Sequence, residues 1–578
     1  MPTMKYTDLH NNLRDHFVQD DIGVWIPKTG VQSFSYTDGR WVERYLEGVF
    51  CSAADLSSDS EELEHHIKDW NTEYHLTRKR KDLLAAFDHP RASNVLEIGC
   101  GCGAITRILG ERYDNVIAAE GSYHRARLAR LRTRDLASVE VVCSPYQKLN
   151  LEGSFDLVFC IGVLEYAPTY VDARDPFDEA LRSMKSMLKS DAALIIAIEN
   201  KLGLKYFGNS TEDHSSTFYE GIEGYPRSSH AFKTFGRIEL HTLLRRYFDD
   251  TEFFYPFPDY KIPVAIFSDK GLAEVPLGEL LGWMHERDYS GRGKTRFDTK
   301  LTWPQIVANG LTRDMANSFI VVARNGSPDV PTLTSAYGAL FNSERRKAFA
   351  TRTLIIGRSD GLCAGKTFVA GCDPVGEHVR GRSGETEWLD HPTVAQELYR
   401  LSFDCKVDRG TLSAPIAAWW SAINALTDED GLLDGSMIDA VWHNSCRLSD
   451  DDVRFFDREL EWKGRIEPSY LLLRSAFQWL VRNRTSRMVH FSAGTLKSGI
   501  CELGKLVSVT FSDTDFARLI EREGLLQAEV GMVDANTAAR KVALALKLQQ
   551  REAVRRAITW TNAQFARGRN LVRRYTVR

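Results

Sequence analysis

The sequence predicts an α/β protein. We expect a doubly wound parallel sheet, preceded by a helical segment and followed by an α+β region and a helical tail. Two observations carry this prediction. Between residues 94 and 200, five short apolar runs alternate with segments of helical spacing, which is typical of a parallel sheet covered by helices. A glycine-rich loop at 99–103 follows the first of these runs and precedes a helical segment.

The elements and domains follow from this pattern and from the length. A chain of 578 residues is long enough for two to four domains at about 150 residues each. The expected strands are 94–98, 116–120, 139–143, 155–161 and 192–199, with a closing strand at 317–323. The expected domains are a helical lead-in at 1–93, the α/β domain at 94–328, an α+β domain at 329–500 and a basic helical region at 501–578.

Composition excludes several classes of protein. The chain is 43% hydrophobic and 26% charged with a net charge of −4, which does not favour a nucleic-acid partner. Its 10 cysteines include no CxxC pair, as expected in a reducing compartment. Neither an apolar signal core nor a spanning run of about 18 apolar residues is present, so we expect a cytoplasmic protein. No His, Asp or Glu cluster has metal-ligand spacing, and no required metal is expected in the α/β domain.

The glycine loop predicts a nucleoside-bearing cofactor. Glycines carry no Cβ, so a ligand can approach the backbone beside a helix N-terminus with free N–H groups. The second strand ends at Glu120, 21 positions after Gly99. This spacing suits an acidic residue that accepts hydrogen bonds from both ribose hydroxyls. Loop and acid together fit both NAD and S-adenosylmethionine.

Three further features favour S-adenosylmethionine. Glu97 stands two residues before the first glycine, the spacing is G-x-G-x-G, and the fourth strand reads FDLVFCIGVLEY. The set resembles the class I S-adenosylmethionine-dependent methyltransferases, which have a Rossmann-like fold, and VLEIGCGCG matches their first motif. The resemblance implies that Glu97 lies near the methionine amino group, Glu120 at the ribose and Gln147 near the adenine. It also places the loop against the cofactor through Gly99, Cys100, Gly101 and Gly103.

The segment at 69–87 leads directly into the strand of the glycine loop. We expect a basic helix at 77–87 with Thr77 as its N-cap. This segment can fold over the cofactor as a lid, which would bring Tyr74 to the cofactor. In the alternative, Tyr74 is a packed aromatic residue beside a structural His75.

A long aperiodic segment, 199–226, leaves the fifth strand at the edge where an acceptor must sit. The stretches ENKLGLKYFG, EDH, GIEGYP, YPFPDYKIP and NSFIVVA look like the methyltransferases of bacterial surface-polysaccharide gene clusters, over residues 34–325. This resemblance implies methylation of a glycan, a lipid-linked glycan or a phosphate on a glycan during O-antigen or capsule synthesis. A small-molecule acceptor is the alternative.

The acceptor decides the catalytic group. A sugar hydroxyl needs a base, and His214 is the candidate because its pKa lies near 7. Asp213 or Glu165 can orient it or replace it. A phosphate needs no base but a cationic clamp, for which the candidates are Lys201, Lys205 and Arg237. His214 also fits a capping or structural role.

The C-terminal half has a different pattern. Two strands at 352–357 and 362–370 flank a turn at 359–361, and helices are expected over 391–427. Asp439, Asn444 and Asp457 have the spacing of a kinase catalytic loop and its metal-binding aspartate, with a short strand between. The region resembles the kinase-like module of bifunctional O-antigen chain-terminating proteins.

That resemblance implies ATP, and Mg²⁺ held by Asn444 and Asp457, with Lys366 at the phosphates and Glu397 as its helical partner. The chain departs from the kinase pattern in lacking His-Arg-Asp and a glycine-rich phosphate loop, so we expect a degenerate kinase-like fold. An unrelated α+β module is the alternative.

The last segment, 535–578, is expected to be helical and basic. From Arg540 onward, 11 basic residues face the single acid Glu552. A basic amphipathic helix binds anionic membrane surfaces, so we expect peripheral contact with the inner membrane. A solvated helix, or a helix that docks polysaccharide-assembly glycosyltransferases, fits equally.

Overall fold

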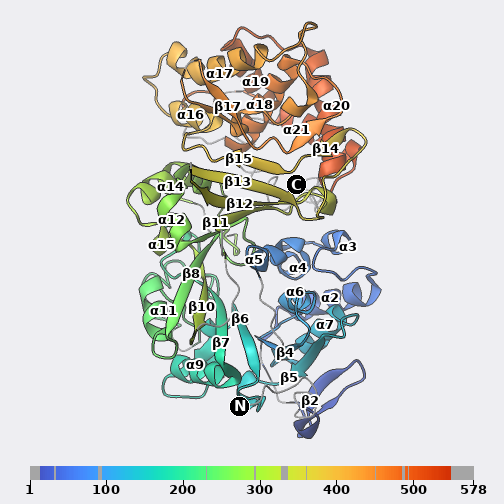
Figure 1. Ribbon diagram of the computed structural model, residues 1–578, viewed down its shortest axis with the longest axis vertical. Coiled ribbons are helices and arrows are strands. Elements are labelled where there is room, and N and C mark those ends of the chain that lie inside the picture. The colour runs from blue at the N-terminus through green and yellow to red at the C-terminus, as the bar shows by residue number, and fades with distance from the viewer. Residues whose placement is uncertain are drawn as a thin grey trace, which may run out of the picture. The chain divides into compact units, whose positions relative to one another are not determined.

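The computed structural model divides into two compact units, residues 1–341 and 342–578 (Figure 1). It describes residues 13–548 except 32, 33, 35, 89–93, 229–230, 285, 292–294, 327–332, 334–335, 360, 450, 484–487 and 492–493. The expected basic tail therefore lies outside the described residues from position 549 onward. No helix in the described part of the chain is long and apolar enough to cross a membrane.

The first unit is built on one mixed sheet. Across it, the strands are β1 (Phe17–Gln19), β2 (Val24–Pro27), β5 (Val139–Cys143), β4 (Val116–Glu120), β3 (Val95–Ile98), β6 (Phe155–Ile161), β7 (Leu188–Glu199), β10 (Ser318–Arg324), β8 (Asp250–Phe257), β9 (Ala265–Ser268) and β11 (Ala336–Asn342). The strands from β2 to β7 are parallel, and the others pair antiparallel.

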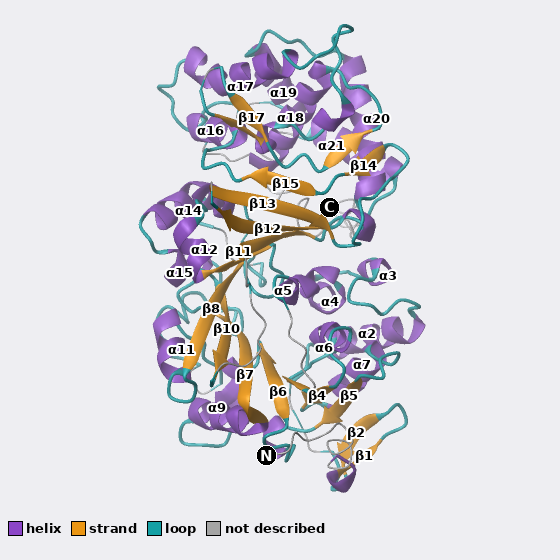
Figure 2. Ribbon diagram, viewed as in Figure 1, coloured by secondary structure: helices purple, strands orange, loops and turns teal. Residues whose placement is uncertain are grey.

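The parallel core confirms the α/β prediction, and the bounds of β4, β5 and β6 are those expected. These strands are continuous buried runs because helices cover both faces of a parallel sheet. Helices α6 (Ala104–Gly110) and α7 (Tyr123–Arg132) pack on β4, and α9 (Pro176–Met187) packs on β6 and β7 (Figure 2).

Two expectations about this unit need correction. The sheet is mixed, because β10 inserts antiparallel between β7 and β8. The lead-in is also not wholly helical, because β1 and β2 form a hairpin whose second strand pairs with β5. Val24 and Trp25 are buried there, and the Trp25 Nε1–H donates to Glu140 (2.7 Å). Apolar residues in so short a segment lack the spacing of a helix face.

The remaining helices of the first unit are mostly short. Thr77 is the expected N-cap, because its side chain accepts from the backbone N–H of Lys79. The expected helix at 77–87 is instead a 3₁₀ turn, η1 (Arg78–Lys81), followed directly by the one-turn helix α5 (Asp82–Ala85). The helices are α2 (Arg40–Ser52), α3 (Glu61–Glu64), α4 (Trp70–Leu76), α5 (Asp82–Ala85), α8 (Ala167–Tyr170), α10 (Leu204–Phe207), α11 (Arg237–Leu244), α12 (Asp269–Glu274), α13 (Gly278–Trp283), α14 (Thr299–Ala308) and α15 (Thr312–Met315).

The second unit combines short strands with helices. Antiparallel β12 (Thr351–Arg358) and β13 (Gly361–Phe368) confirm the expected strand pair, and β15 (Gly384–Glu387) joins β13. The other pairs are β14 (Val379–Gly381) with β18 (Leu460–Trp462), and β16 (Ser445–Arg447) with β17 (Val453–Phe455). Its helices are α16 (Val394–Leu401), α17 (Arg409–Asn424), α18 (Pro468–Asn483), α19 (Leu496–Lys505), α20 (Asp513–Val530) and α21 (Ala535–Lys547).

Candidate active site

Three glycines shape the loop between β3 and α6. Gly99, Gly101 and Gly103 have φ values of +69°, +57° and +85°, which side chains rarely adopt. A Cβ on Gly103 would lie 2.8 Å from the Cα of Ala129, and one on Gly99 would lie 2.5 Å from a methyl carbon of Val163. The loop therefore has both the conformation and the close packing that only glycine allows.

Glu120 ties the end of β4 to this loop. Its carboxylate accepts hydrogen bonds from the backbone N–H of Gly101 (2.8 Å) and of Ser122 (2.9 Å). A carboxylate has about four acceptor positions, so two remain for the hydroxyls of a ribose. The sequence-predicted Glu120 thus lies beside the glycine loop, at the edge where ligands of parallel sheets bind.

Glu97 is a buried carboxyl group at the same edge. It is 3% exposed, and its Oε2 has no hydrogen-bond partner among the described residues. Burial raises the pKa of Glu97 to about 8. A buried carboxyl oxygen without a donor is costly, so this side chain is suited to a cationic ligand such as an ammonium group.

The N-terminal segment closes over the loop through an ionic cluster. Asp38 pairs with Arg125 of α7 (2.6 Å) and with His75 of α4 (3.0 Å). Burial raises the pKa of Asp38, but the hydrogen bond from His75 and the charge of Arg125 outweigh it and lower the pKa to about 2. Because Arg125 also lies 2.6 Å from a Cβ position on Gly101, this lid is anchored directly beside the loop.

Aromatic rings continue from the lid toward the end of β6. The guanidinium of Arg125 lies over the ring of Tyr36 (4.6 Å). Tyr36 meets Tyr166 edge-on (5.5 Å), and Tyr166 meets His214 edge-on (5.2 Å). The expected lid residue Tyr74 stacks under Arg80 (4.5 Å). These contacts connect the glycine loop to the segment expected to hold the acceptor.

The other expected cofactor residues also follow strand ends. Cys100 is buried within the loop, and burial raises the pKa of its thiol. Gln147 lies half-buried in the 3₁₀ turn η2 (Tyr146–Lys148) that follows β5.

Glu165, Glu199 and His214 form a second cluster, which we call the acceptor triad. Glu165 lies in the 3₁₀ turn η3 (Leu164–Tyr166) after β6, Glu199 ends β7, and His214 belongs to the aperiodic segment. The Nε2 of His214 lies 3.6 Å from Oε1 of Glu165 and 3.9 Å from Oε2 of Glu199. The structure therefore brings the expected His214 and Glu165 together and adds Glu199.

Glu212 orients the histidine. Its Oε1 pairs with Nδ1 of His214 (2.8 Å), and its Oε2 accepts from the backbone N–H groups of His214 (2.8 Å) and Ser215 (2.7 Å). Burial lowers the pKa of His214, but Glu199, Glu165 and Glu212 outweigh it and raise the pKa well above its ordinary value. Glu212, and not Asp213, is thus the acid that holds the imidazole.

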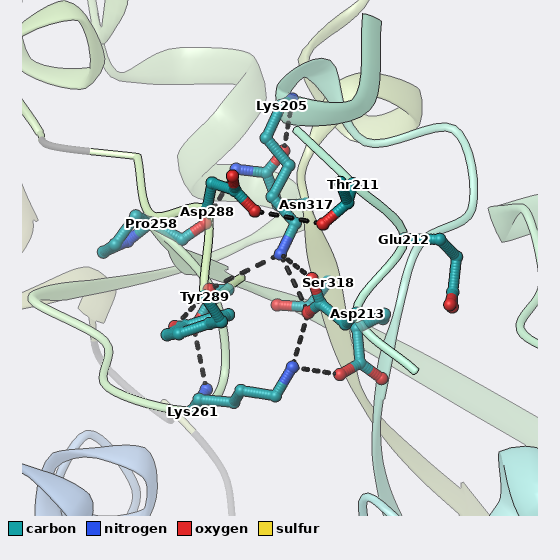
Figure 3. A network of polar contacts seen from close by, with 12 residues as sticks. Lys205, Thr211, Glu212, Asp213, Pro258, Lys261, Asp288, Tyr289, Asn317 and Ser318 are labelled. Atoms are coloured by element: carbon teal, nitrogen blue, oxygen red, sulfur yellow. Dashed lines mark hydrogen bonds and ion pairs between the residues drawn. The ribbon is translucent and has the colours of Figure 1, made fainter. Parts of the chain in front are cut away.

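Asp213 belongs instead to a lysine network. Lys205 donates to both of its oxygens (2.9 and 3.1 Å), and Lys261, which follows β8 in the sequence, also donates to it (Figure 3). Burial raises the pKa of Asp213, but the two lysines outweigh it and hold the pKa well below its usual range. Lys261 also pairs with Glu199, which links this network to the acceptor triad.

The expected phosphate clamp is already neutralised. Lys201 pairs with Glu239 (2.7 Å), and Arg237 pairs with Asp314 (2.9 Å). With Lys205 bound to Asp213, each of the three candidate cations has an acidic partner. The sequence pattern did not reveal these pairs, and two of the partners, Glu239 and Asp314, come from distant segments.

Sequence reasoning did not single out Glu199, Glu212, Lys261, Asp38 or Arg125. Glu199 carried a usable signal, since it is an acidic residue at the carboxyl end of an expected strand. Glu212 directly precedes the two expected catalytic residues. Lys261 and Arg125 carry no signal in the sequence, because their acidic partners lie next to them only in the folded chain.

In the second unit, Lys366 pairs with Asp457 and Glu459. The Nδ2–H of Asn444 donates to the backbone carbonyls of Asp439 (3.0 Å) and Asp457 (3.4 Å). The expected partner of Lys366 needs correction: Glu397 pairs with Arg447 (3.1 Å between Nε and Oε2), which competes for its carboxylate.

A family model described as "Methyltransferase domain" matches residues 96–196. These residues span the glycine loop, Glu120 and Glu165. The chain therefore carries an S-adenosylmethionine-dependent methyltransferase domain in the first unit.

Two curated proteins are similar to part of this chain. Nodulation protein S of Bradyrhizobium diazoefficiens is 29% identical over 104 residues, which are 18% of this chain and 48% of that protein. Trans-aconitate 2-methyltransferase of Rhizobium leguminosarum bv. trifolii is 29% identical over 107 residues, 18% of this chain and 41% of that protein. The chain thus spans about half the length of the curated relatives it matches.

Among solved structures, the N-methyltransferase NodS from Bradyrhizobium japonicum WM9 aligns with 43% of this chain and 95% of its own. The TM-score is 0.25 and the sequence identity is 14%.

Proposed function

We propose that the protein transfers the methyl group of S-adenosylmethionine to a hydroxyl oxygen of a sugar in a bacterial surface polysaccharide such as O-antigen. The observation that supports the cofactor is the buried carboxyl of Glu97 beside the glycine loop, whose Oε2 has no hydrogen-bond partner among the described residues. The ammonium of the methionine moiety supplies the positive charge that this carboxyl lacks. Glu120 would take the ribose hydroxyls at the end of the neighbouring strand.

We call the acceptor triad together with the neighbouring lysine network the acceptor half of the site. Its net charge favours a hydroxyl over a phosphate as the methyl acceptor. The acids there outnumber the bases: they are Glu165, Glu199, Glu212, Asp213 and Asp259, against Lys205, Lys261 and His214. A phosphate would meet this net negative group in a buried setting, where like charges repel strongly. A neutral hydroxyl would instead find hydrogen-bond acceptors.

The chain's own residues would orient the acceptor and take its proton. S-adenosylmethionine supplies an electrophilic methyl group and its own leaving group, so the protein mainly provides positioning. The acceptor triad lies within reach of the lid through Tyr166, on the side of the sheet edge away from Glu120. The hydroxyl proton would pass to a carboxylate of the triad as the methyl group leaves the sulfur for the oxygen, because the raised pKa of His214 leaves its imidazole already protonated.

The glycan assignment rests on the resemblance over residues 34–325. The stretches that carry it include EDH and YPFPDYKIP, which supply Asp213, His214, Asp259 and Lys261 to the acceptor half. The reaction would then take place on the cytoplasmic face of the inner membrane, beside the assembling glycosyltransferases.

The experiment incubates the full chain with methyl-labelled S-adenosylmethionine and lipid-linked glycan extracted from a strain that lacks the gene. We expect label in the glycan fraction, and mass spectrometry of the surface polysaccharide should show 14-mass-unit losses in that strain, one methylene per site. Label found only in protein or only in small molecules would contradict the proposal that the methyl acceptor is a glycan. If the chain did not bind S-adenosylmethionine at all, the proposed methyltransferase activity would be contradicted.

A second activity is favoured by one arrangement in the second unit. Asp457 has φ +51°, a strained conformation for a non-glycine residue, and pairs with Lys366. Asn444 joins it to the loop of Asp439. We propose this group as an ATP- and Mg²⁺-binding site that phosphorylates the glycan end.

The matched variants for this second activity are Asp457→Asn and Asp452→Asn, the latter an exposed acid near Arg454. Transfer of labelled phosphate from ATP should be lost in Asp457→Asn and kept in Asp452→Asn. No ATP binding to the full chain with Mg²⁺ present would overturn the kinase proposal and leave the methyltransferase untouched.

A further inference from the structure

The acceptor triad has the composition and spacing of a metal-ligand set. One carboxylate oxygen of Glu165, one of Glu199 and a ring nitrogen of His214 all lie within 4.8 Å of one another. Ligand atoms that share one cation at about 2.1 Å stand roughly 3.0–3.5 Å apart. The 3.6 and 3.9 Å distances from Nε2 to the two carboxylates therefore need only small side-chain movements to close around an ion.

Two of the triad's oxygens have no hydrogen-bond partner in the described part of the chain. They are Oε2 of Glu165 and Oε2 of Glu199, and each side chain is 1% exposed. Glu199 uses its other oxygen for Lys261 and Tyr260 (3.3 Å to the phenol). Buried carboxylate oxygens without donors are costly, and a cation bound to both carboxylates would offset that cost.

The histidine is held in the orientation that metal ligation requires. Nδ1 pairs with Glu212, whose second oxygen is fixed by two backbone N–H groups. This leaves Nε2 directed at Glu165 and Glu199. Histidines that bind metals almost always donate their other ring N–H to a carboxylate or carbonyl group, which fixes the tautomer.

We propose that Glu165, Glu199 and His214 bind a divalent cation of the Mn²⁺/Zn²⁺ class. One imidazole and two carboxylates suit these ions better than Ca²⁺ or Cu⁺. Three protein ligands leave open coordination positions, and an oxygen of the acceptor can take one. The sequence did not reveal this set, because positions 165, 199 and 214 have no metal-ligand spacing and meet only in the fold.

A second group of ligand-type residues provides a contrast. Asp38, His75 and Cys102 are also within ligand distance of one another. There, however, Arg125 lies 2.6 Å from the Asp38 carboxylate and already supplies the positive charge. In the acceptor triad Lys261 pairs with the other oxygen of Glu199, whereas Oε2 of Glu165 and Oε2 of Glu199 have no hydrogen-bond partner among the described residues.

The role of the ion in methyl transfer rests on the proposed function, whereas its binding does not. The experiment therefore measures metal binding directly. The full chain is stripped with a chelator and titrated with Co²⁺, whose visible absorption reports coordination by nitrogen and oxygen ligands. We expect about one Co²⁺ per chain, and Glu165→Gln and Glu199→Gln should each weaken binding at least tenfold.

Matched variants separate the site from general effects. His241→Ala removes an exposed histidine bonded to Thr251, and Asp38→Asn alters the other ligand group, so both should bind Co²⁺ as the unmodified chain does. Circular dichroism confirms that each variant is folded. Unchanged Co²⁺ affinity in both glutamine variants, or no stoichiometric binding, would overturn the proposal. Co²⁺ binding without S-adenosylmethionine binding would keep the metal site and remove the proposed function.

Discussion

The carboxylate of Glu120 accepts a hydrogen bond from the backbone N–H of Gly101 over 2.8 Å. This contact joins the end of β4 to the middle of the glycine loop. Glu120, which we expect to bind the ribose, therefore also holds the glycine loop, which we expect to contact the rest of the cofactor.

Glu120→Ala should weaken S-adenosylmethionine binding at least tenfold. The variant loses hydrogen bonds to the ribose and leaves the Gly101 N–H without its acceptor, and hydrogen bonds to a charged group contribute about 1.5–3 kcal/mol each. Titration calorimetry on the full chain measures the affinity. Glu152→Ala, at an exposed position, is the control. Equal affinities in the two variants would show that Glu120 does not touch the cofactor.

Glu97 should make cofactor binding release a proton. Its pKa of about 8 leaves it mostly protonated at pH 7 in the free protein, and pairing with an ammonium would ionise it. We expect release of about 0.9 proton at pH 7 and little at pH 9. Calorimetry in two buffers with different ionisation enthalpies measures this number. Glu97→Gln should bind more weakly with no release, and a release identical to that of the unmodified chain would rule Glu97 out as its source.

Gly103→Ala should destabilise the first unit more than Gly224→Ala. Both glycines have a positive φ, +85° and +84°, so both variants incur backbone strain of about 1 kcal/mol. Only the Cβ at 103 meets backbone, at 2.8 Å from Ala129, whereas nothing lies within 4 Å at 224. Scanning calorimetry should show the lower melting temperature for Gly103→Ala, and indistinguishable melting would contradict the close packing of the loop on α7.

The ion pairs of Asp38 should stabilise the first unit above pH 4. Because its pKa falls from 3.8 to about 2 on folding, the stabilisation is present above the unfolded value and is lost as pH falls through the folded one. The shift corresponds to about 2 kcal/mol at pH 7. Asp38→Asn should therefore melt lower at pH 7, with the difference narrowing between pH 4 and pH 2.

The control for this pH dependence is Asp21→Asn. Its carboxylate pairs with Arg127 but is 70% exposed, so solvent screens the pair and its removal should change stability little. A constant difference between Asp38→Asn and the unmodified chain across the whole pH range would assign its effect to packing instead of charge.

Much of the first unit could be predicted because its signals are local. β4, β5 and β6 are short apolar runs whose neighbours cover them on both faces, and their bounds follow from hydrophobicity alone. The glycines at 99, 101 and 103 and the acid at 120 also follow from local spacing. The order of the later strands could not be predicted, because antiparallel β10 enters the sheet from more than 100 residues beyond β7.

The sequence by itself determined the parallel core, the glycine loop and Glu120, since each depends on residues close together along the chain. Only the tertiary structure decided which charges meet: Asp213 with Lys205 and Lys261, Glu212 with His214, and Glu165 with Glu199. These side chains come from strand ends and an aperiodic segment that no periodicity relates. A buried charge is costly unless it is paired, so these side chains interact where the fold buries them together. The linear order of residues does not show which side chains become buried side by side.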